Sequence, residues 1–291
     1  MSFPKNRNRR LRSSDAIRSL VQENHLRLTD LIVPFFLIEG TGKKEEITSM
    51  PGYYRYTLDL LVDEVRICYD LGLRSVLLFV KCEDGLKDNS GKEAINPNGL
   101  MQRGISAIKK EVPDIYLLSD VALDPYSEFG HDGIVEEVEI VNDKTIEVLG
   151  EVALSHARAG VDMVAPSDMM DGRIGVIRHK LEENGFVNTG IMSYSAKYAS
   201  AFYGPFRDAL DSAPGFGNKK TYQMNIANSN EAIREVEMDI EEGADMIMIK
   251  PGMPYLDVVK LVSDSFNIPV VAYQVSGEYA MIKAASEKGW L

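Results

Sequence analysis

The chain has 291 residues, of which 45% are hydrophobic, which is enough for one large core or at most two domains. Its formal net charge of −12 argues against a nucleic-acid-binding surface, and no apolar run reaches the ~20 residues of a membrane span. Two cysteines, Cys68 and Cys82, suit neither a disulfide framework nor a thiolate metal site, and the N-terminus lacks the apolar segment of a signal peptide, so a cytoplasmic protein is expected.

The N-terminal end of the chain is basic, whereas the remainder is acidic. Residues 1–18 carry six lysines or arginines against one acid, Asp15, a net charge of +5, which leaves −17 for the rest of the −12 chain. Such an arm can dock on the acidic body or on a second copy of it, and the alternative is a solvated terminus. We therefore predict an N-terminal arm at 1–25 and one barrel domain at 26–291.

Short apolar runs alternate with amphipathic segments along the body of the chain. Most runs are continuous, which is typical of strands buried on both faces of a parallel sheet. The predicted strands are 31–38, 75–80, 115–123, 163–167, 190–194, 246–250 and 269–275. The predicted helices are 57–71, 99–110, 144–159, 230–242, 255–265 and 278–288.

This alternation predicts an α/β fold of the TIM (β/α)8 type, in which catalytic groups lie at the carboxyl ends of the strands. Eight strands close such a barrel, and we find seven. The barrel is then open, completed by a strand from elsewhere, or cut short. The irregular segment at about 200–222 contains many Gly, Pro and aromatic residues, and we expect it to be an active-site lid.

Two lysines end apolar, strand-like runs. Lys197 follows the run at 190–194, and Lys250 directly follows Met246-Ile247-Met248-Ile249. Burying an ammonium is costly unless it is paired or neutralised, and burial and a nearby second cation both lower the pKa of a lysine. Such a lysine is a candidate amine nucleophile. The two together favour chemistry in which carbonyl substrates are held as Schiff bases.

Other predicted strand ends supply carboxylates and hydroxyls. A Ser or Asp that follows a strand is more often a helix N-cap than a site residue. Five strand ends nevertheless bring polar groups to one rim of the predicted barrel, and this convergence favours a site. The groups are Asp120 and Asp124, Ser167, Lys197, Lys250 and Ser276.

Longer motifs around these residues resemble the porphobilinogen synthase family, whose members are also called 5-aminolevulinate dehydratases. The resemblance runs from about Arg9 to Leu291. The matching motifs are DVALDPY (120–126), GHDG (130–133), MVAPSDMMDGR (163–173), SAK (195–197), FRD (206–208), GADMIMIKPG (243–252) and YQVSGEYAM (273–281).

The resemblance implies a lyase of tetrapyrrole and heme biosynthesis that condenses two 5-aminolevulinate molecules to porphobilinogen with loss of two waters. It implies that the A-side substrate becomes an imine on Lys197 and the P-side substrate an imine on Lys250. The residues that it places at the substrates are Arg207, Lys219 and Gln223 for the A-side carboxylate, Ser276 for the P-side carboxylate, and Asp120 and Ser167 around the reacting groups.

The resemblance also bears on metals. Zinc-type members carry three cysteines where this chain has Ala122, Asp124 and Asp132. Carboxylates suit hard cations such as Mg²⁺ better than Zn²⁺, so no active-site zinc is expected. Asp124 and Asp132 either hold a hydrated or monovalent cation or act without metal. An allosteric Mg²⁺ is implied elsewhere, with Glu235 as its ligand, and His131 is expected to be structural.

The resemblance also bears on the oligomer and on the C-terminal end of the fold. Family members form homo-octamers in which basic arms embrace neighbouring subunits, and Arg12 is expected to approach the Glu235 region of a neighbour. The family continues past the position of Trp290 with a helix and a last strand, which carries a tyrosine for the P-side carboxylate. Their lack here makes a C-terminally truncated, catalytically impaired relative one alternative, and a non-catalytic subunit another. A class I Schiff-base aldolase is a third, but it needs only one essential lysine.

Overall fold

The computed structural model describes residues 4–210, 212 and 214–291. Residues 1–3 of the predicted arm, and 211 and 213 of the predicted lid, lie outside that description. All seven predicted strands are present, although several have shifted ends. They are β1 (Ile32–Ile38), β4 (Ser75–Val80), β5 (Tyr116–Val121), β8 (Met163–Pro166), β9 (Gly190–Lys197), β10 (Met246–Lys250) and β11 (Val270–Ala272).

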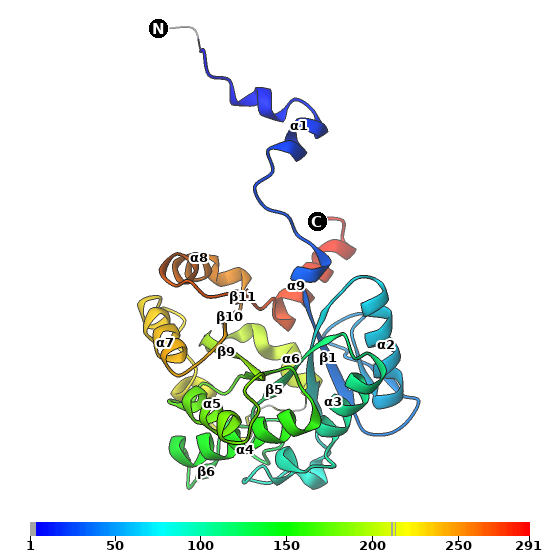
Figure 1. The fold of residues 1–291 in the computed structure, drawn as a ribbon, viewed down its shortest axis with the longest axis vertical. Coiled ribbons are helices and arrows are strands. Elements are labelled where there is room, and N and C mark those ends of the chain that lie inside the picture. The colour runs from blue at the N-terminus through cyan, green and yellow to red at the C-terminus, as the bar shows by residue number, and fades with distance from the viewer. Residues whose placement is uncertain (1–3, 211, 213) are drawn as a thin grey trace.

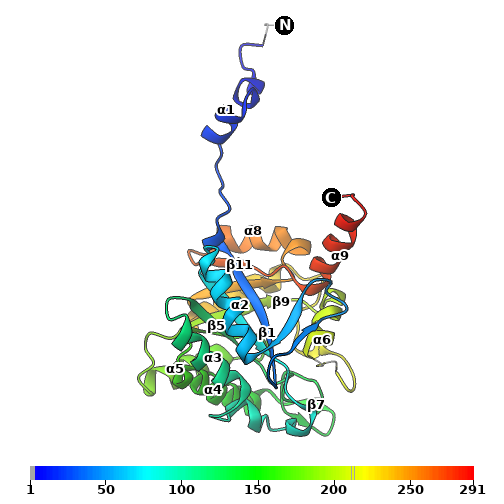
Figure 2. The same ribbon diagram turned by 90° about the vertical axis from the view of Figure 1, so that its right-hand side faces the viewer.

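These seven strands form one parallel sheet in which each strand lies beside the next one in this series, from β1 to β11. Helices lie along the outside of the curved sheet (Figures 1 and 2). Parallel strands linked by helices are the arrangement predicted for a TIM-type barrel. The carboxyl ends of all seven strands therefore lie at one rim.

Six helices were predicted, with ends within about two residues of those observed. They are α2 (Leu58–Asp70), α3 (Leu100–Glu111), α4 (Asn142–Ala159), α7 (Asn230–Glu241), α8 (Leu256–Ser265) and α9 (Ser276–Glu287). Two further helices in the barrel, α5 (Arg173–Glu183) and α6 (Gly204–Leu210), were not predicted. In α5 the buried apolar residues are Ile174, Ile177 and Leu181, a helical spacing that is masked by the charged residues between them.

Four short strands were not predicted either. β3 (Tyr54–Thr57) runs parallel to β1, and β2 (Lys44–Glu46) pairs antiparallel with β3 at the edge of the sheet. β6 (Val135–Glu136) and β7 (Glu139–Ile140) form a separate hairpin. β2 consists of exposed charged residues, so it carries none of the apolar signal by which a buried strand is recognised.

The sheet separates two apolar clusters. One cluster lies between the strands and the surrounding helices and includes Leu61, Ile105 and Ile177. The other lies on the opposite face of the strands, inside the barrel, and includes Phe36 and Tyr194. Because side chains alternate along a strand, residues two apart enter the same cluster. Asp120 follows Leu118 and Lys250 follows Met248 at this spacing, so the inward positions below these two rim residues are filled.

The barrel does not close between β11 and β1, as expected. Within the described residues no strand pairs with both of them. A cavity of about 660 Å³ lies between their facing sides, and residues of both strands line it, among them Ile32, Pro34 and Val271. Phe36, Leu118 and Met248 of the inward apolar cluster also line this cavity. The gap therefore opens into the lumen of the barrel. No described helix is both long and apolar enough to cross a membrane.

The N-terminal segment extends away from the barrel. It contains a 3-10 helix, η1 (Asn8–Arg12), and α1 (Asp15–Leu20), and neither has a buried residue. Figures 1 and 2 show both elements far from the sheet. Exposed apolar side chains accompany the basic ones, including Leu20 and Leu26, which are 79% and 82% exposed.

A buried ion pair joins α5 to α7. The Arg173 guanidinium, 2% exposed, donates to both carboxylate oxygens of Asp239 at 2.6 and 3.2 Å, and to the Ser193 hydroxyl at 2.9 Å. Burial lowers the pKa of Arg173, but Asp239 and Asp168 more than offset this, so the pKa is raised. The guanidinium is therefore charged and depends on its carboxylate partners.

Asp239→Asn should lower the free energy of unfolding by about 3 kcal/mol, because it leaves a buried guanidinium without its bidentate counter-ion. Urea unfolding followed by circular dichroism measures the change. Asp264→Asn is the matched control, since Asp264 forms an exposed helical pair with Lys260 and should cost less than about 1 kcal/mol. Equal effects of the two substitutions would contradict this assignment.

Candidate active site

The two lysines predicted as nucleophiles lie side by side. Lys197 is the last residue of β9 and Lys250 the last of β10, and they are register partners across the two parallel strands. Both are buried, with 6% and 4% exposure. Neighbouring strands lie ~4.8 Å apart, so the two side chains leave the rim together.

An irregularity in β9 makes this alignment possible. Ser193 pairs with Ile247, whereas Ala196 pairs with Ile249, so three steps along β9 match two along β10. This is the signature of a bulge, which places one extra residue in β9. Tyr194 and Lys197 are three residues apart and would face opposite sides of a regular strand. With the bulge, both face the lumen.

Lys250 has the lowered pKa expected of an amine nucleophile. Burial is the main cause and the neighbouring Lys197 the second, and together they lower the pKa of Lys250 to about 7. Asp120, Asp124 and Asp132 act in the opposite direction. A substantial fraction of Lys250 is therefore neutral near pH 7, which is the form that attacks a carbonyl.

Asp120 and Ser167 lie beside the lysines. Asp120 is in β5, and burial followed by the nearby Asp124 raises its pKa to about 7. The Ser167 side chain hydrogen-bonds Asp120, and the Ser167 carbonyl accepts a bond from Lys197. One carboxylate oxygen of Asp120 is buried without a partner among the described residues. The pKa of Asp120 is thus raised and that of Lys250 lowered toward neutrality, and one carboxylate oxygen of Asp120 remains for a ligand.

A second carboxylate cluster surrounds Lys219. The Lys219 ammonium lies 2.6 Å from an oxygen of Asp132 and 3.3 Å from one of Asp124, and Asp132 also lies 3.6 Å from Lys197. Burial alone would raise the pKa of Asp132, but Lys219 and Lys197 lower it to about 2. The same carboxylates raise the pKa of Lys219. An ammonium thus already lies between the two carboxylates considered for a cation and offsets part of their charge.

His131 is hydrogen-bonded through both ring nitrogens. One ring nitrogen hydrogen-bonds the Tyr222 hydroxyl at 3.0 Å and the other the Phe216 carbonyl at 3.0 Å. Tyr222 in turn donates to Asp132 at 2.9 Å. Both partners of His131 belong to the segment predicted to be a lid, residues 200–222, which we call the lid segment. His131 therefore joins the lid to the carboxylate cluster.

The remaining predicted residues lie on or against the lid. Gln223, just beyond it, is buried with its side-chain oxygen unpartnered among the described residues, whereas Arg207 in α6 is partly exposed. Ser276 begins α9, and its hydroxyl accepts from the Phe206 amide at 2.9 Å and donates to the Phe202 carbonyl at 3.3 Å. Ser276 thus holds the first part of the lid onto α9.

Comparison with known proteins identifies the arrangement. Residues 5–291 match the family described as delta-aminolevulinic acid dehydratase. The chain belongs to this family. The family and lyase function predicted from the sequence are thereby confirmed, and the aldolase alternative is disfavoured.

Individual relatives are similar over almost the whole chain. The delta-aminolevulinic acid dehydratase of Methanothermus sociabilis is 53% identical over 291 residues, which are 100% of this chain and 90% of the relative. That of Bradyrhizobium diazoefficiens is 54% identical over 98% of this chain and 81% of the relative. The solved structure of the Toxoplasma gondii ME49 enzyme in complex with porphobilinogen superposes with a TM-score of 0.97 and 51% identity, covering 99% of this chain and 82% of that one.

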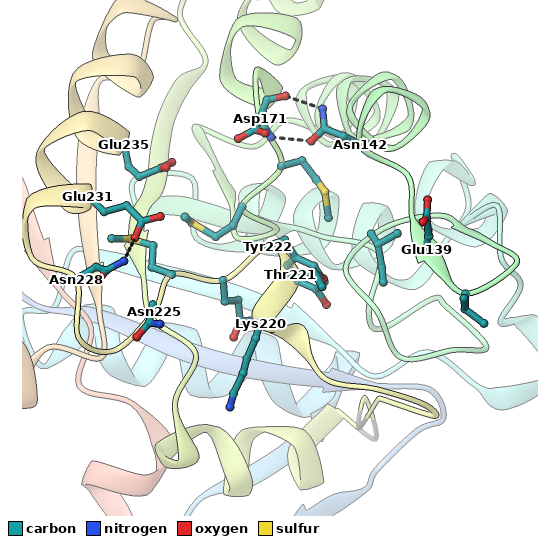
Figure 3. Close-up of a pocket in the computed structure, with 16 residues that line it drawn as sticks. Glu139, Asn142, Asp171, Lys220, Thr221, Tyr222, Asn225, Asn228, Glu231 and Glu235 are labelled. Carbon is teal, nitrogen blue, oxygen red and sulfur yellow. Dashed lines mark hydrogen bonds between the residues drawn. The ribbon is translucent and has the colours of Figure 1, made fainter.

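The dehydratase fold places Glu235 apart from the lysines, in a second pocket. This pocket has a volume of about 600 Å³, and Glu235, Glu231, Asp171 and Glu139 all line it (Figure 3). Burial raises the pKa of Glu235, and the carboxylates of Asp239, Asp171 and Glu231 add to this effect, whereas Arg173 opposes it. The pocket is therefore acidic and its half-buried carboxylate lacks full compensation.

Sequence reasoning missed the aromatic side chains of the dehydratase site. Tyr194, Tyr203, Phe206 and Tyr273 surround the Lys250 amine, with ring centroids 4.5–5.3 Å from it. The many aromatic residues in the lid were noticed, but not their target. Tyr194 could not be assigned to the lumen, because regular alternation would place it opposite Lys197.

Gly277→Ala should lower kcat/KM for the dehydratase reaction roughly 10- to 100-fold, because the lid would move. A β-carbon at 277 would lie 2.6 Å from the Phe202 carbonyl oxygen and 2.8 Å from its α-carbon, both backbone atoms of the lid. Gly204→Ala is the control in the same lid, since its β-carbon would meet nothing within 4 Å. A reduction confined to Gly204→Ala would refute the predicted clash.

Proposed function

We propose that the chain condenses two molecules of 5-aminolevulinate to porphobilinogen through imines on Lys197 and Lys250. The observation that carries this proposal is the pairing of two buried lysines in register at the carboxyl ends of β9 and β10. A single-imine reaction requires one amine, and this geometry supplies two within reach of one pair of condensing substrates.

Each imine forms by the same balanced step. The neutral amine adds to the ketone carbon, and the resulting carbinolamine loses the ketone oxygen as water to give a carbon–nitrogen double bond. The iminium withdraws electrons, which activates the carbon for attack and acidifies the adjacent C–H. Asp120, whose pKa burial raises toward neutrality, is suited to accept and return the protons that these steps move.

Binding of the substrate carboxylates follows from the same geometry. We assign the A-side carboxylate to Arg207, Lys219 and Gln223, whose guanidinium, ammonium and side-chain amide N–H groups can all donate to it. Ser276 is assigned to the P-side carboxylate. Lys219 would then share its positive charge between Asp124, Asp132 and the substrate carboxylate, so the Arg207 guanidinium is needed as a second cation.

The donor set near the lysines fits an ammonium better than a metal ion. Asp124 and Asp132 supply hard oxygens and no thiolate, which disfavours zinc, and Lys219 lies between them at 3.3 and 2.6 Å. We therefore propose that Lys219 supplies the cation of this cluster. A monovalent or hydrated cation would have to displace it.

The acidic pocket fits a hydrated Mg²⁺. Glu235, Glu231 and Asp171 line the pocket, and a bound cation would relieve the repulsion that raises the pKa of Glu235. Among the described residues no three His, Cys, Asp or Glu side chains lie close enough to hold a dehydrated ion, so most ligands of the ion would be water. Bound there, Mg²⁺ would supply positive charge beside α7, away from the reacting groups.

Assembly into a homo-octamer is part of the same proposal. The exposed basic arm has no buried residue of its own, and the body carries the opposite charge. Arg12 reaching the acidic pocket of a neighbouring subunit would pair a guanidinium with carboxylates that repel one another. The free cysteines fit a reducing, cytoplasmic location.

Borohydride reduction in the presence of 5-aminolevulinate should trap adducts on Lys197 and Lys250, mapped by mass spectrometry while porphobilinogen is assayed. Trapping at Lys250 should reach half its maximal rate at about pH 7 and fall about tenfold per pH unit below that. The reason is that the amine is neutral above its lowered pKa and becomes protonated below it. Lys250→Met should lower product formation on the order of 10³-fold or more.

Lys260→Met is the control for this experiment, because Lys260 is exposed on α8 and should neither be trapped nor affect product formation. Adducts at both lysines without product would identify the catalytically impaired relative. Absence of any adduct at Lys197 and Lys250 would refute the proposed mechanism.

Glu235→Gln should abolish the response of activity to Mg²⁺. In the unmodified protein, titration of chelator-treated protein with Mg²⁺ should raise activity roughly 5-fold, a coupling typical of an allosteric ligand. Glu241→Gln, an exposed change on the same helix, should retain the full response. An unchanged response in Glu235→Gln would place the ion elsewhere.

A further inference from the structure

We propose that Tyr194, Tyr203, Phe206 and Tyr273 form an aromatic box whose ring faces stabilise the cationic iminium on Lys250, and that the lid completes this box. The inference rests on the proposed imine at Lys250. It assigns a role in the reaction to four side chains that the proposed chemistry does not otherwise use.

The geometry of the box is that of cation–π contacts. The Lys250 amine lies 4.5 Å from the ring centroid of Tyr273, 4.8 Å from Phe206, 5.0 Å from Tyr194 and 5.3 Å from Tyr203. All four distances are within the ~6 Å over which a ring quadrupole attracts a cation, and the attraction is strongest where water is excluded. Lys250 is 4% exposed, so the contacts are dry.

The rings carry no formal charge of their own. Burial raises the pKa of Tyr194, Tyr203 and Tyr273 well above the usual value, so their hydroxyls stay protonated. Other charged groups that act on Lys250 are Lys197 on β9, Asp120 on β5, and Asp124 and Asp132 in the following loop. The box thus adds stabilisation of a cation without adding a base or a competing salt bridge.

Two walls of the box are fixed and two belong to the lid. Tyr194 lies in β9 and Tyr273 directly follows β11, whereas Tyr203 ends the 3-10 helix η5 (Ala201–Tyr203) and Phe206 lies in α6. The Tyr203 hydroxyl donates to the Lys250 carbonyl at 3.1 Å, which ties the lid to the residue that it covers. Positive charge on Lys250 therefore favours the lid position shown.

The Tyr194 ring serves both lysines. Its centroid lies 5.8 Å from the Lys197 amine as well as 5.0 Å from that of Lys250. The ring therefore gives an attractive contact to two positive groups that repel each other. The β9 bulge, which turns Tyr194 into the lumen, is what makes this contact available.

Stepwise fluorination of Phe206 tests the proposal, since mono-, di- and trifluorophenylalanine weaken the ring quadrupole while keeping its shape. Along the series kcat should fall progressively, to roughly one tenth for the trifluoro ring, because the iminium is destabilised. The acid limb of Lys250 trapping should move to lower pH by several tenths of a unit, because the ammonium is destabilised too. A packing defect would not shift this limb.

The same series at Phe266 is the control, because Phe266 is partly buried at the end of α8 and no cation–π contact among the described residues involves it. Phe206→Leu, which keeps an apolar side chain without a quadrupole, should behave like the trifluoro protein. A flat kcat and an unmoved limb across the Phe206 series would overturn the box even with Lys250 trapped normally. Failure of trapping in the unmodified protein would instead overturn the proposed imine.

Discussion

Two amines held side by side in a dry barrel rim are the constraint to which the other site residues respond. Lys197 and Lys250 are register partners on neighbouring strands, and both are almost fully buried. Two ammonium groups at this separation repel strongly in a medium of low dielectric constant. The structure reduces this repulsion by lowering the pKa of Lys250 and by placing Asp132 beside Lys197. Reactivity and stability of the buried charges thus have the same origin.

The backbone of β9 determines which side chains share this space. Along β10 a simple alternation brings Met246, Met248 and Lys250 to the lumen. In β9 the bulge resets the alternation, so that Tyr194 and Lys197 both turn inward. A regular strand would leave either the ring or the amine on the outer face of the sheet, away from Lys250. One additional residue in β9 therefore brings both the Tyr194 ring and the Lys197 amine into the lumen.

The sequence predicts those parts of the molecule that depend on local pattern. Continuous apolar runs located the seven strands from β1 to β11 that carry the rim, and the polar residues that follow them located the rim itself, whereas the short parallel strand β3 was missed. Pattern does not reveal contacts between distant segments, such as the ion pair of Lys219 with Asp124, 95 residues earlier. It also does not reveal a bulge, since β9 carries no interior glycine that would mark one. The helix α5 was missed because Arg173, one of its buried residues, is charged and looks like a surface residue.

The serine that begins α9 has one hydroxyl proton and two neighbours in the lid. Its oxygen accepts a hydrogen bond from the Phe206 amide, and its only O–H donates to the Phe202 carbonyl. A carboxylate can only accept a hydrogen bond. Any carboxylate that binds the Ser276 hydroxyl must therefore replace the Phe202 carbonyl as its acceptor. The hydrogen bond from the Phe206 amide can remain, because the hydroxyl oxygen accepts it through a lone pair whichever acceptor its O–H faces. Binding of a carboxylate at Ser276 and release of the Phe202 carbonyl would then be a single step. The number of hydrogen bonds that Ser276 donates stays the same, and only the acceptor changes.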